Sequence, residues 1–456
     1  MQTMEMTTDL AQLAALDVEH LVHPLTNLHD HQTKGPLIWD RGEGIDLIDA
    51  TGKRYIDAAA GMWNVNVGHG REELAVVAAE QMGRLEYASS FGGSSNRPSI
   101  ELAQHLAHLA PGDLNTVFFT AGGSEANDSA FKLTRLYWKQ RGFPGKRTII
   151  GRHMGYHGLT LATTQATGIP RYWQMVEPGV DGFTHVSPPY AYRHAAGLGD
   201  EAFVDRLAAE LEETIERLDP ATVAAFLAEP VMGTGGVLVP PDAYFPRVRE
   251  ICDRYDILLI ADEVITGFGR TGRWFAMEHW DVVPDIMTIA KGITSGYVPL
   301  GSVVLSDRVR GSLYDDPDLT LMHGFTYTGH PVACAVGLRN IKIMERERLV
   351  ERAARVGPYL LSRLTEVGDR HDRVGEVRGL GMMVGVEFVL DRATRAEAAQ
   401  PDRLAPKVAR QALERGLICR PMPGSDVLAF SPPLIAEEGD VDRIAAILDA
   451  AIAAVR

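Results

Sequence analysis

The sequence is poor in cysteine and has neither a basic run nor a long apolar run. Cys252, Cys334 and Cys419 lie far apart and in no CxxC spacing, so we predict neither a disulfide framework nor a zinc site, and assign no metal ligands. The 45 Lys and Arg against 60 Asp and Glu give a formal net charge of -15, which argues against a nucleic-acid partner. No stretch approaches the roughly 20 apolar residues of a membrane span, and the N-terminus does not resemble a signal peptide. We therefore expect a cytoplasmic protein that does not bind membranes.

The chain is long enough for more than one domain, with 456 residues of which 45% are hydrophobic and 23% charged. From about Thr116 onward, short apolar runs alternate with helical patterns, as in TVFFTA, RTIIGRH, VAAFLAEP and ILLIADEV. Continuous apolar runs are typical of strands buried on both faces, so we predict a mostly parallel sheet covered by helices. Such sheets bind ligands at the ends of their strands.

The pattern changes after Pro331, where long helical stretches and a glycine-punctuated β segment predict a smaller α+β domain. The N-terminal segment IDLIDATGKRYIDAAAG predicts a hairpin with a turn at Thr51 and Gly52, and we expect this hairpin to join the C-terminal domain. The predicted organisation is an N-terminal segment over residues 1–64, a large domain over 65–330 and a small domain over 331–456.

Two charged residues end neighbouring apolar runs. The run in ILLIADEVITGFGRTG ends at Asp262, and the run in DIMTIAKGITSGYVPLG ends at Lys291. Taken alone, the aspartate is more typical of a capping or salt-bridged residue, and the lysine is equally typical of a catalytic or a snorkelling side chain. Together they fit a pyridoxal phosphate site, in which the lysine amine bonds to the cofactor aldehyde and the carboxylate pairs with the protonated ring nitrogen. The pair therefore predicts two catalytic residues.

A glycine-rich turn supplies a candidate phosphate site. In TAGGSEAND a strand leads through Gly122 and Gly123 to Ser124, and a helix is expected to begin near Glu125. Backbone N–H groups at helix N-termini and glycine-rich turns bind anions, although such a turn alone is usually only a helix cap. Its position after the first strand of the βα region favours the phosphate site.

Several longer segments match the blocks of one family in order and spacing: AEPVMGTGGV, LLIADEVITGFGRTG, AKGITSGYVPLG and HGFTYTGHPVACA. Over nearly its whole length, the chain resembles a class III aminotransferase of fold type I. The resemblance implies an α/β fold, with a mostly parallel sheet of the seven-stranded type in the large domain and a smaller α+β domain built from both termini. It also implies pyridoxal phosphate as the cofactor and a homodimer whose sites lie at the subunit interface.

The resemblance assigns roles to individual residues. Lys291 would form the Schiff base, Asp262 would pair with the ring nitrogen, Val264 would pack on one ring face and Tyr156 of GYHG would stack on the other. The other implied cofactor-binding residues are Gly123 and Ser124 at the phosphate, His157, Glu229, and Thr328, which would reach the phosphate of the neighbouring subunit. By their positions alone, Thr328 could equally be a helix N-cap, and Glu229 an ordinary hydrogen-bonded residue at a strand end.

The pocket of the amine:pyruvate branch, the ω-transaminases, is matched by Leu25, Trp63, Phe91 and Tyr156. Leu25 stands where relatives often have a bulkier aromatic residue. In that branch an arginine binds the substrate carboxylate, and the matching residue is Arg420 in LICRPMPG, although an arginine in a loop is more often merely solvated. Ornithine and 4-aminobutyrate enzymes usually carry a glutamate at the position of Thr234, and that glutamate pairs with the arginine. The threonine here leaves Arg420 available to a carboxylate such as that of pyruvate.

We therefore predict transfer of an amino group from a primary amine or an ω-/β-amino acid to pyruvate, giving L-alanine. Two alternatives within the same fold are a 4-aminobutyrate or ornithine type of aminotransferase that uses 2-oxoglutarate, and a pyridoxal phosphate decarboxylase or aminomutase. A third alternative is a binding protein that kept the fold but lost the chemistry, and the presence of Lys291, Asp262 and Tyr156 argues against it. A cofactor-free α/β protein with chance motifs is the fourth, and the number of matching blocks argues against it.

Overall fold

The computed structural model describes residues 9–399 and 401–455, and its centre is a seven-stranded sheet in the order β4-β10-β9-β8-β7-β5-β6. The strands β9, β8, β7, β5 and β6 run parallel, whereas β10 pairs antiparallel with both β9 and β4. Their bounds are Thr116–Thr120 (β4), Thr148–Arg152 (β5), Phe183–Val186 (β6), Val223–Ala228 (β7), Leu258–Asp262 (β8), Ile286–Ile289 (β9) and Gly301–Leu305 (β10). The predicted α/β fold with a mostly parallel sheet is confirmed.

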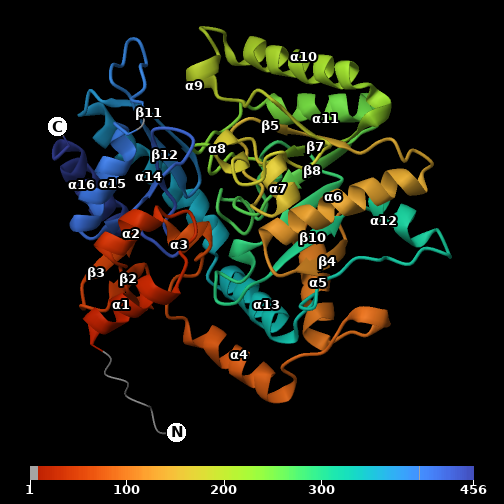
Figure 1. Ribbon diagram of the computed structural model, residues 1–456, viewed down its shortest axis with the longest axis horizontal. Coiled ribbons are helices and arrows are strands. Elements are labelled where there is room, and N and C mark those ends of the chain that lie inside the picture. Colours follow the sequence, from red (N-terminus) through yellow and green to blue (C-terminus); the bar gives the residue numbers. More distant parts are fainter. Residues whose placement is uncertain (1–8, 400, 456) are drawn as a thin grey trace.

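Helices cover both faces of this sheet (Figure 1). In β8, Leu258 and Ile260 lie in one apolar cluster with side chains of α6 (Gly123–Gln140). Leu259 and Ala261 lie in another cluster, with side chains of α10 (Asp200–Leu218) and α11 (Tyr244–Arg254). Every residue of β7, β8 and β9 is buried, which explains why these strands read as continuous apolar runs in the sequence.

Other helices and helical turns connect and flank these elements. They are α3 (Ala60–Trp63), α4 (Glu72–Arg84), η1 (Phe91–Gly93), α5 (Arg97–Leu109), α7 (Leu161–Ala166), α8 (Pro170–Trp173), α9 (Ala191–His194), η2 (Pro220–Thr222), η3 (Ala276–His279), η4 (Lys291–Ile293) and α12 (Asp307–Tyr314). The three cysteines are buried and unbridged, as the sequence predicts. Within the described ranges, every helix is too short or too polar to cross a lipid bilayer.

In a second part of the molecule, N-terminal elements lie beside C-terminal ones (Figure 1). The strands β1 (Trp39–Glu43), β2 (Asp46–Asp49) and β3 (Arg54–Asp57) form antiparallel pairs, and β3 pairs in parallel with β13 (Leu417–Ile418). The predicted hairpin and its association with the C-terminal part are therefore confirmed. We retain the domain boundaries after residues 64 and 330 as a proposal.

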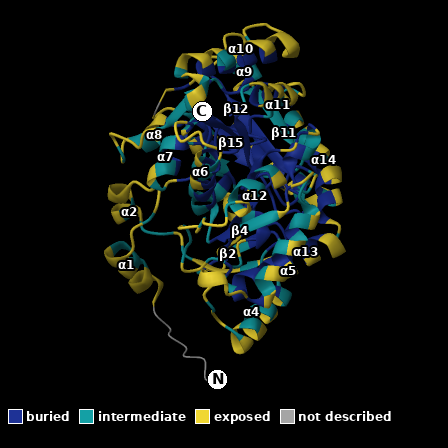
Figure 2. Ribbon diagram, turned by 90° about the vertical axis from the view of Figure 1, so that its right-hand side faces the viewer, coloured by how far each residue is buried: buried dark blue, intermediate teal, exposed yellow. Residues whose placement is uncertain are grey.

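The rest of the C-terminal part is an antiparallel sheet in the order β11-β12-β15-β14, packed with helices. Its strands are β11 (Val374–Leu380), β12 (Met383–Phe388), β14 (Arg420–Pro421) and β15 (Val427–Phe430), and its helices are α13 (Pro331–Arg346), α14 (Leu349–Asp369), α15 (Leu404–Glu414) and α16 (Glu438–Ala453). The first helices of the chain differ from all of these. As Figure 2 shows, α1 (Leu10–His20) and α2 (Leu28–Lys34) lie at the surface, and neither contains a buried residue.

Candidate active site

A cavity of about 360 Å³ lies at the carboxyl ends of β7, β8 and β9. These strands are parallel neighbours, so the residues at their ends, Glu229, Asp262 and Lys291, meet at one edge of the sheet. The cavity is lined by all the predicted cofactor-binding residues except Thr328: Gly123, Ser124, Tyr156, His157, Glu229, Asp262, Val264 and Lys291. The structure thus brings together residues that the sequence separates by up to about a third of the length of the chain.

Asp262 is a buried carboxylate held by three donors. One oxygen accepts hydrogen bonds from Nδ2 of Asn127 at 2.8 Å and Nδ1 of His157 at 2.7 Å, and the other accepts from the N–H of Val264 at 3.1 Å. Burial by itself raises the pKa of Asp262, but the hydrogen bonds from His157, Asn127 and Val264 outweigh burial and hold the pKa below its usual range. The carboxyl group is therefore ionised at neutral pH and can stabilise a positive charge beside it.

Lys291 follows β9 with a φ of +49°, a left-handed conformation that is uncommon for a residue with a side chain. Burial lowers the pKa of its amine to about 8, against the opposing effects of Asp262 and Glu229. No carboxylate among the described residues forms an ion pair with this amine, although Asp262 lines the same cavity. An amine with this pKa is partly neutral near pH 7, as a Schiff-base lysine must be.

The turn before α6 is built for a close approach of a ligand to the backbone. Gly122 is the N-cap residue of α6, and no side chain caps the helix there. A Cβ atom on Gly122 would meet nothing within 4 Å, whereas one on Gly123 would lie 2.8 Å from Cγ1 of Val264. Ser124 Oγ accepts a hydrogen bond from the N–H of Leu159 at 3.3 Å. The start of this 18-residue helix therefore offers N–H groups, and the positive end of its dipole, to an anion in the cavity.

Glu229 fixes the backbone around the cavity. Its two carboxylate oxygens accept from the N–H groups of Tyr156 at 3.0 Å and Gly233 at 2.9 Å. Burial raises the pKa of Glu229. The hydrogen-bonding role that the sequence left open for Glu229 is thus present, and one of the N–H groups that it holds belongs to the cavity-lining Tyr156.

Arg420 begins β14 and pairs in register with Ala429 of β15. Burial lowers the pKa of its guanidinium, and the neighbouring Tyr172 and Tyr156 oppose that shift. The rings of these two tyrosines lie 5.8 Å apart, centroid to centroid. In the part of the chain that the structure describes, no carboxylate forms an ion pair with Arg420, and Thr234, buried in the loop after β7, brings no charge.

The other predicted residues lie away from this cavity. Leu25 is 64% exposed between α1 and α2, and Phe91 is 58% exposed in η1. Trp63 is 1% exposed and packs in the cluster that contains Val231 and Met422. Thr328 does not cap a helix, because α13 has His330 as its N-cap residue, so the capping alternative was wrong. Its hydroxyl accepts from the N–H of Phe325 at 3.1 Å.

Sequence reasoning missed two residues of this site. Asn127 binds Asp262, accepts from Thr288 Oγ1 at 2.9 Å and donates to the carbonyl of His157 at 2.8 Å. The sequence does contain a signal for Asn127, because an amide side chain on the buried face of a helix needs hydrogen-bond partners. Tyr172 of α8 packs against Tyr156, and nothing in its sequence surroundings indicates this contact.

The residues around the cavity fit pyridoxal phosphate. An amine of lowered pKa, an ionised buried carboxylate and an uncapped helix start suit the aldehyde, the ring nitrogen and the phosphate of that cofactor. Nε2 of His157 is buried without a hydrogen-bond partner among the described residues, as expected of a group beside a ligand site. The cavity volume is also within the usual range for small-molecule sites.

Comparison with known proteins agrees with this geometry. Residues 28–452 match the family model described as aminotransferase class-III. A putrescine–pyruvate aminotransferase of Pseudomonas aeruginosa is 41% identical over 432 residues, which cover 94% of this chain and 93% of that protein. The crystal structure of a thermostable (S)-enantioselective omega-transaminase from Thermomicrobium roseum is 49% identical with a TM-score of 0.95, covering 98% of this chain and 99% of that one.

An omega-transaminase from Pseudomonas jessenii, solved in complex with PMP, is 43% identical with a TM-score of 0.94, covering 97% of both chains. The cofactor of the present protein is pyridoxal phosphate, and its substrates are a small-molecule amine donor and a keto-acid acceptor. The chain belongs to the class III aminotransferase family and is of the omega-transaminase type.

Proposed function

We propose that the protein transfers the amino group of a primary amine or an ω-/β-amino acid to pyruvate, giving L-alanine. The observation that carries this proposal is Arg420, a partly buried guanidinium beside Tyr156 and Tyr172 that has no carboxylate partner in the described chain. A guanidinium binds a carboxylate through two parallel N–H donors. With the neutral Thr234 in place of an acidic partner, Arg420 is free to bind the carboxylate of pyruvate or alanine.

Lys291 and Asp262 carry the chemistry in this proposal. Bound pyridoxal phosphate supplies an electron-withdrawing ring that stabilises negative charge at the substrate carbon. The Lys291 amine first holds the cofactor and, once freed, takes the proton from the substrate carbon, for which its pKa of about 8 is suited. Asp262 stabilises positive charge at the ring nitrogen, and its three hydrogen bonds keep the carboxylate ionised and oriented.

The remaining lining residues position the cofactor. The N–H groups at Gly123 and Ser124 bind the phosphate, as the uncapped start of α6 suggests. Val264 and Tyr156 line the cavity and would pack on the cofactor ring, and Tyr156 is held through its N–H by Glu229. His157 orients Asp262 through its Nδ1. Replacement of any of these groups is expected to weaken cofactor binding more than it weakens the fold.

We also propose that the site is completed by a second copy of the chain in a homodimer. Thr328 and Phe91 lie near each other, since Ser90 Oγ donates to the carbonyl of Thr328 at 3.0 Å. Neither lines the cavity of its own chain, and Phe91 and Leu25 are exposed. Thr328 would then bind the phosphate in the partner's site. Phe91, Leu25, Trp63 and Thr234 remain proposed substrate-pocket residues.

Mixed dimers test the assignment of Thr328. When Lys291→Ala and Thr328→Ala chains are combined, one site holds an intact Lys291 and receives an intact Thr328 from the other chain. We therefore expect the mixture to be more active than either variant alone. If Thr328 serves its own subunit, every site of the mixed dimer has lost one of the two residues and no recovery is expected.

The acceptor is tested by running the purified enzyme with one aryl-alkyl amine and either pyruvate or 2-oxoglutarate. We expect alanine to form at a much higher kcat/KM than glutamate. A preference for 2-oxoglutarate would indicate the 4-aminobutyrate or ornithine type of enzyme instead. Release of carbon dioxide from an amino acid, without a keto-acid product, would indicate a decarboxylase.

A further inference from the structure

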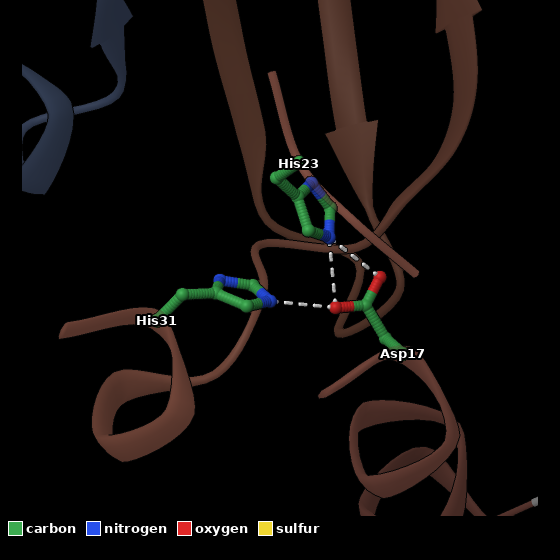
Figure 3. Close-up of side chains that lie close together, drawn as sticks. All are labelled: Asp17, His23 and His31. Carbon is green, nitrogen blue, oxygen red and sulfur yellow. Dashed lines mark hydrogen bonds and ion pairs between the residues drawn. The ribbon is translucent and has the colours of Figure 1, made fainter. Parts of the chain in front are cut away.

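Two histidines and an aspartate converge in the segment of residues 9–36, which we call the N-terminal strap. Asp17 is in the last turns of α1, His23 is in the loop after α1, and His31 is on α2 (Figure 3). Both imidazole rings point at the same carboxylate: Nε2 of His31 lies 2.8 Å and Nε2 of His23 lies 2.9 Å from Oδ1 of Asp17. Nε2 of His23 is also 3.0 Å from Oδ2.

The three groups are close to the arrangement that a small divalent cation requires. One donor atom from each residue lies within 4.8 Å of the other two. Zinc–ligand distances of about 2.0–2.1 Å place two ligands of a tetrahedral site about 3.3 Å apart. To become a coordination site, the cluster must lengthen its two N···O distances by about 0.5 Å and bring the two imidazole donor atoms, which lie within 4.8 Å of each other, to about 3.3 Å. The side chains are 28%, 11% and 17% exposed for His23, His31 and Asp17, so a cation can enter from solvent.

The donor types select the class of cation. Two imidazole nitrogens and one carboxylate oxygen suit Zn²⁺ and the other late first-row divalent cations. Calcium and magnesium prefer oxygen ligands and are disfavoured here. Three protein ligands leave a fourth position for water. The spacing of the cysteines does not predict this site, and His23 and His31 stand in no metal motif of the sequence.

The strap has little else to hold its two helices together. Neither α1 nor α2 contains a buried residue, so apolar packing contributes little to their relative position. In the described part of the chain, the contacts of Asp17 with His23 and His31 are the side-chain hydrogen bonds that join α1 to the loop and helix after it. A cation at this point would therefore add a link between α1 and α2 to these hydrogen bonds.

We propose that Asp17, His23 and His31 bind a divalent late first-row transition cation, with Zn²⁺ as the representative, which clasps α1 to α2. Leu25 is two residues from His23, so the clasp also fixes the loop that carries this exposed side chain. The site lies outside the cavity that holds Lys291, and cation binding there is independent of the proposed amino-group transfer.

The test is a titration of the holoenzyme with Zn²⁺ in competition with a chromophoric chelator. We compare the parent with Asp17→Asn, His23→Gln and His31→Gln. His29→Gln is the matched control, since His29 is an exposed histidine of the same helix outside the cluster. We expect the parent and the control to bind one equivalent that each cluster variant loses, with affinity falling by at least about 10–100-fold, because loss of outer-shell partners alone has that effect.

A second readout does not depend on the variants. Co²⁺ replaces Zn²⁺ in such sites, and we expect the parent to give the visible absorption of a four-coordinate nitrogen and oxygen site. Bound cation should also slow proteolysis within the strap in the parent and in His29→Gln alike. Equal Zn²⁺ binding by the parent and the cluster variants, or no binding by the parent, would overturn the proposal and leave a hydrogen-bonded cluster only.

Discussion

Replacement of Arg420 by glutamine is expected to separate substrates that carry a carboxylate from amines that do not. Arg420 has no carboxylate partner within the described residues, and burial lowers the pKa of its guanidinium. Water therefore compensates its charge only in part, and the carboxylate of alanine or pyruvate gains the full benefit of the interaction. Glutamine keeps a polar side chain of moderate length but loses the charge and the fork of parallel donors.

The size of the effect follows from the hydrogen bonds lost. A hydrogen bond to a charged group contributes about 1.5–3 kcal/mol, and the partial burial of Arg420 supports the upper end. A loss of about 3 kcal/mol corresponds to about a 100-fold decrease, since about 1.4 kcal/mol is a factor of ten. We therefore expect kcat/KM for L-alanine and for pyruvate to fall about 100-fold, while the value for an aryl-alkyl amine changes by less than a factor of about 3.

The assay is the single-turnover reaction of the holoenzyme with each donor, followed by loss of the visible absorption band of the cofactor. Arg415→Gln is the control, because Arg415 is an exposed arginine of the same region whose side chain, among the described residues, hydrogen-bonds to Gln411 alone. Equal losses with alanine and the amine would mean that Arg420 supports the fold of the site rather than a carboxylate. No loss with either donor would show that the substrate carboxylate binds elsewhere.

Further predictions concern the residues around the cofactor. Asn127→Ala removes the hydrogen bonds of Asn127 with Asp262, Thr288 and the carbonyl of His157, so the free energy of unfolding in urea should fall by about 1–3 kcal/mol and the reaction with amines should slow. An unchanged rate would exclude a positioning role. In the cofactor-free protein, acylation of Lys291 should rise with pH up to about 8 and then level off, because only the neutral amine reacts. A rise that continues towards 10.5, after subtraction of the Lys291→Ala background, would contradict the lowered pKa. Gly123→Ala places a methyl group 2.8 Å from Val264, so the protein should retain less cofactor on dialysis. Adding Val264→Ala should partly restore retention. The control Gly83→Ala has open space around it and should behave like the parent. Full retention in Gly123→Ala would show that the turn adapts.

The sequence predicted the central sheet well because its strands are marked by local patterns. Strands such as β7 and β8 are continuous apolar runs, and each ends at a polar residue. Because parallel strands bring their carboxyl ends to one edge, Asp262 and Lys291 could be placed together without a structure, whereas Glu229 was placed beside them by the family resemblance. Strand β10 was not predicted, although only 11 residues separate its start at Gly301 from the end of β9 at Ile289. A parallel pair of strands needs a crossover connection of about a dozen residues or more. The short connection here therefore agrees with the observed antiparallel pairing of β9 and β10.

The surroundings of the site were less predictable. Asn127 acts through contacts with three segments that are distant in the sequence, so its role depends on the tertiary fold. Trp63 was assigned to the substrate pocket by the resemblance to the ω-transaminases. Its ring packs in an apolar cluster within its own chain, and its role in the pocket stays a prediction. In the proposed homodimer, Leu25, Phe91 and Thr328 would depend on contacts between chains, which one sequence cannot specify, and their roles stay predictions.

The most direct test of the account is the visible absorption spectrum of the purified holoenzyme before and after addition of L-alanine, with pyruvate measured in the same sample. We predict a cofactor band that disappears on addition of alanine while one equivalent of pyruvate forms, and that is absent from Lys291→Ala. A parent protein that shows no such band after incubation with pyridoxal phosphate, or a band that alanine and amines leave unchanged, would contradict amino-group transfer through Lys291.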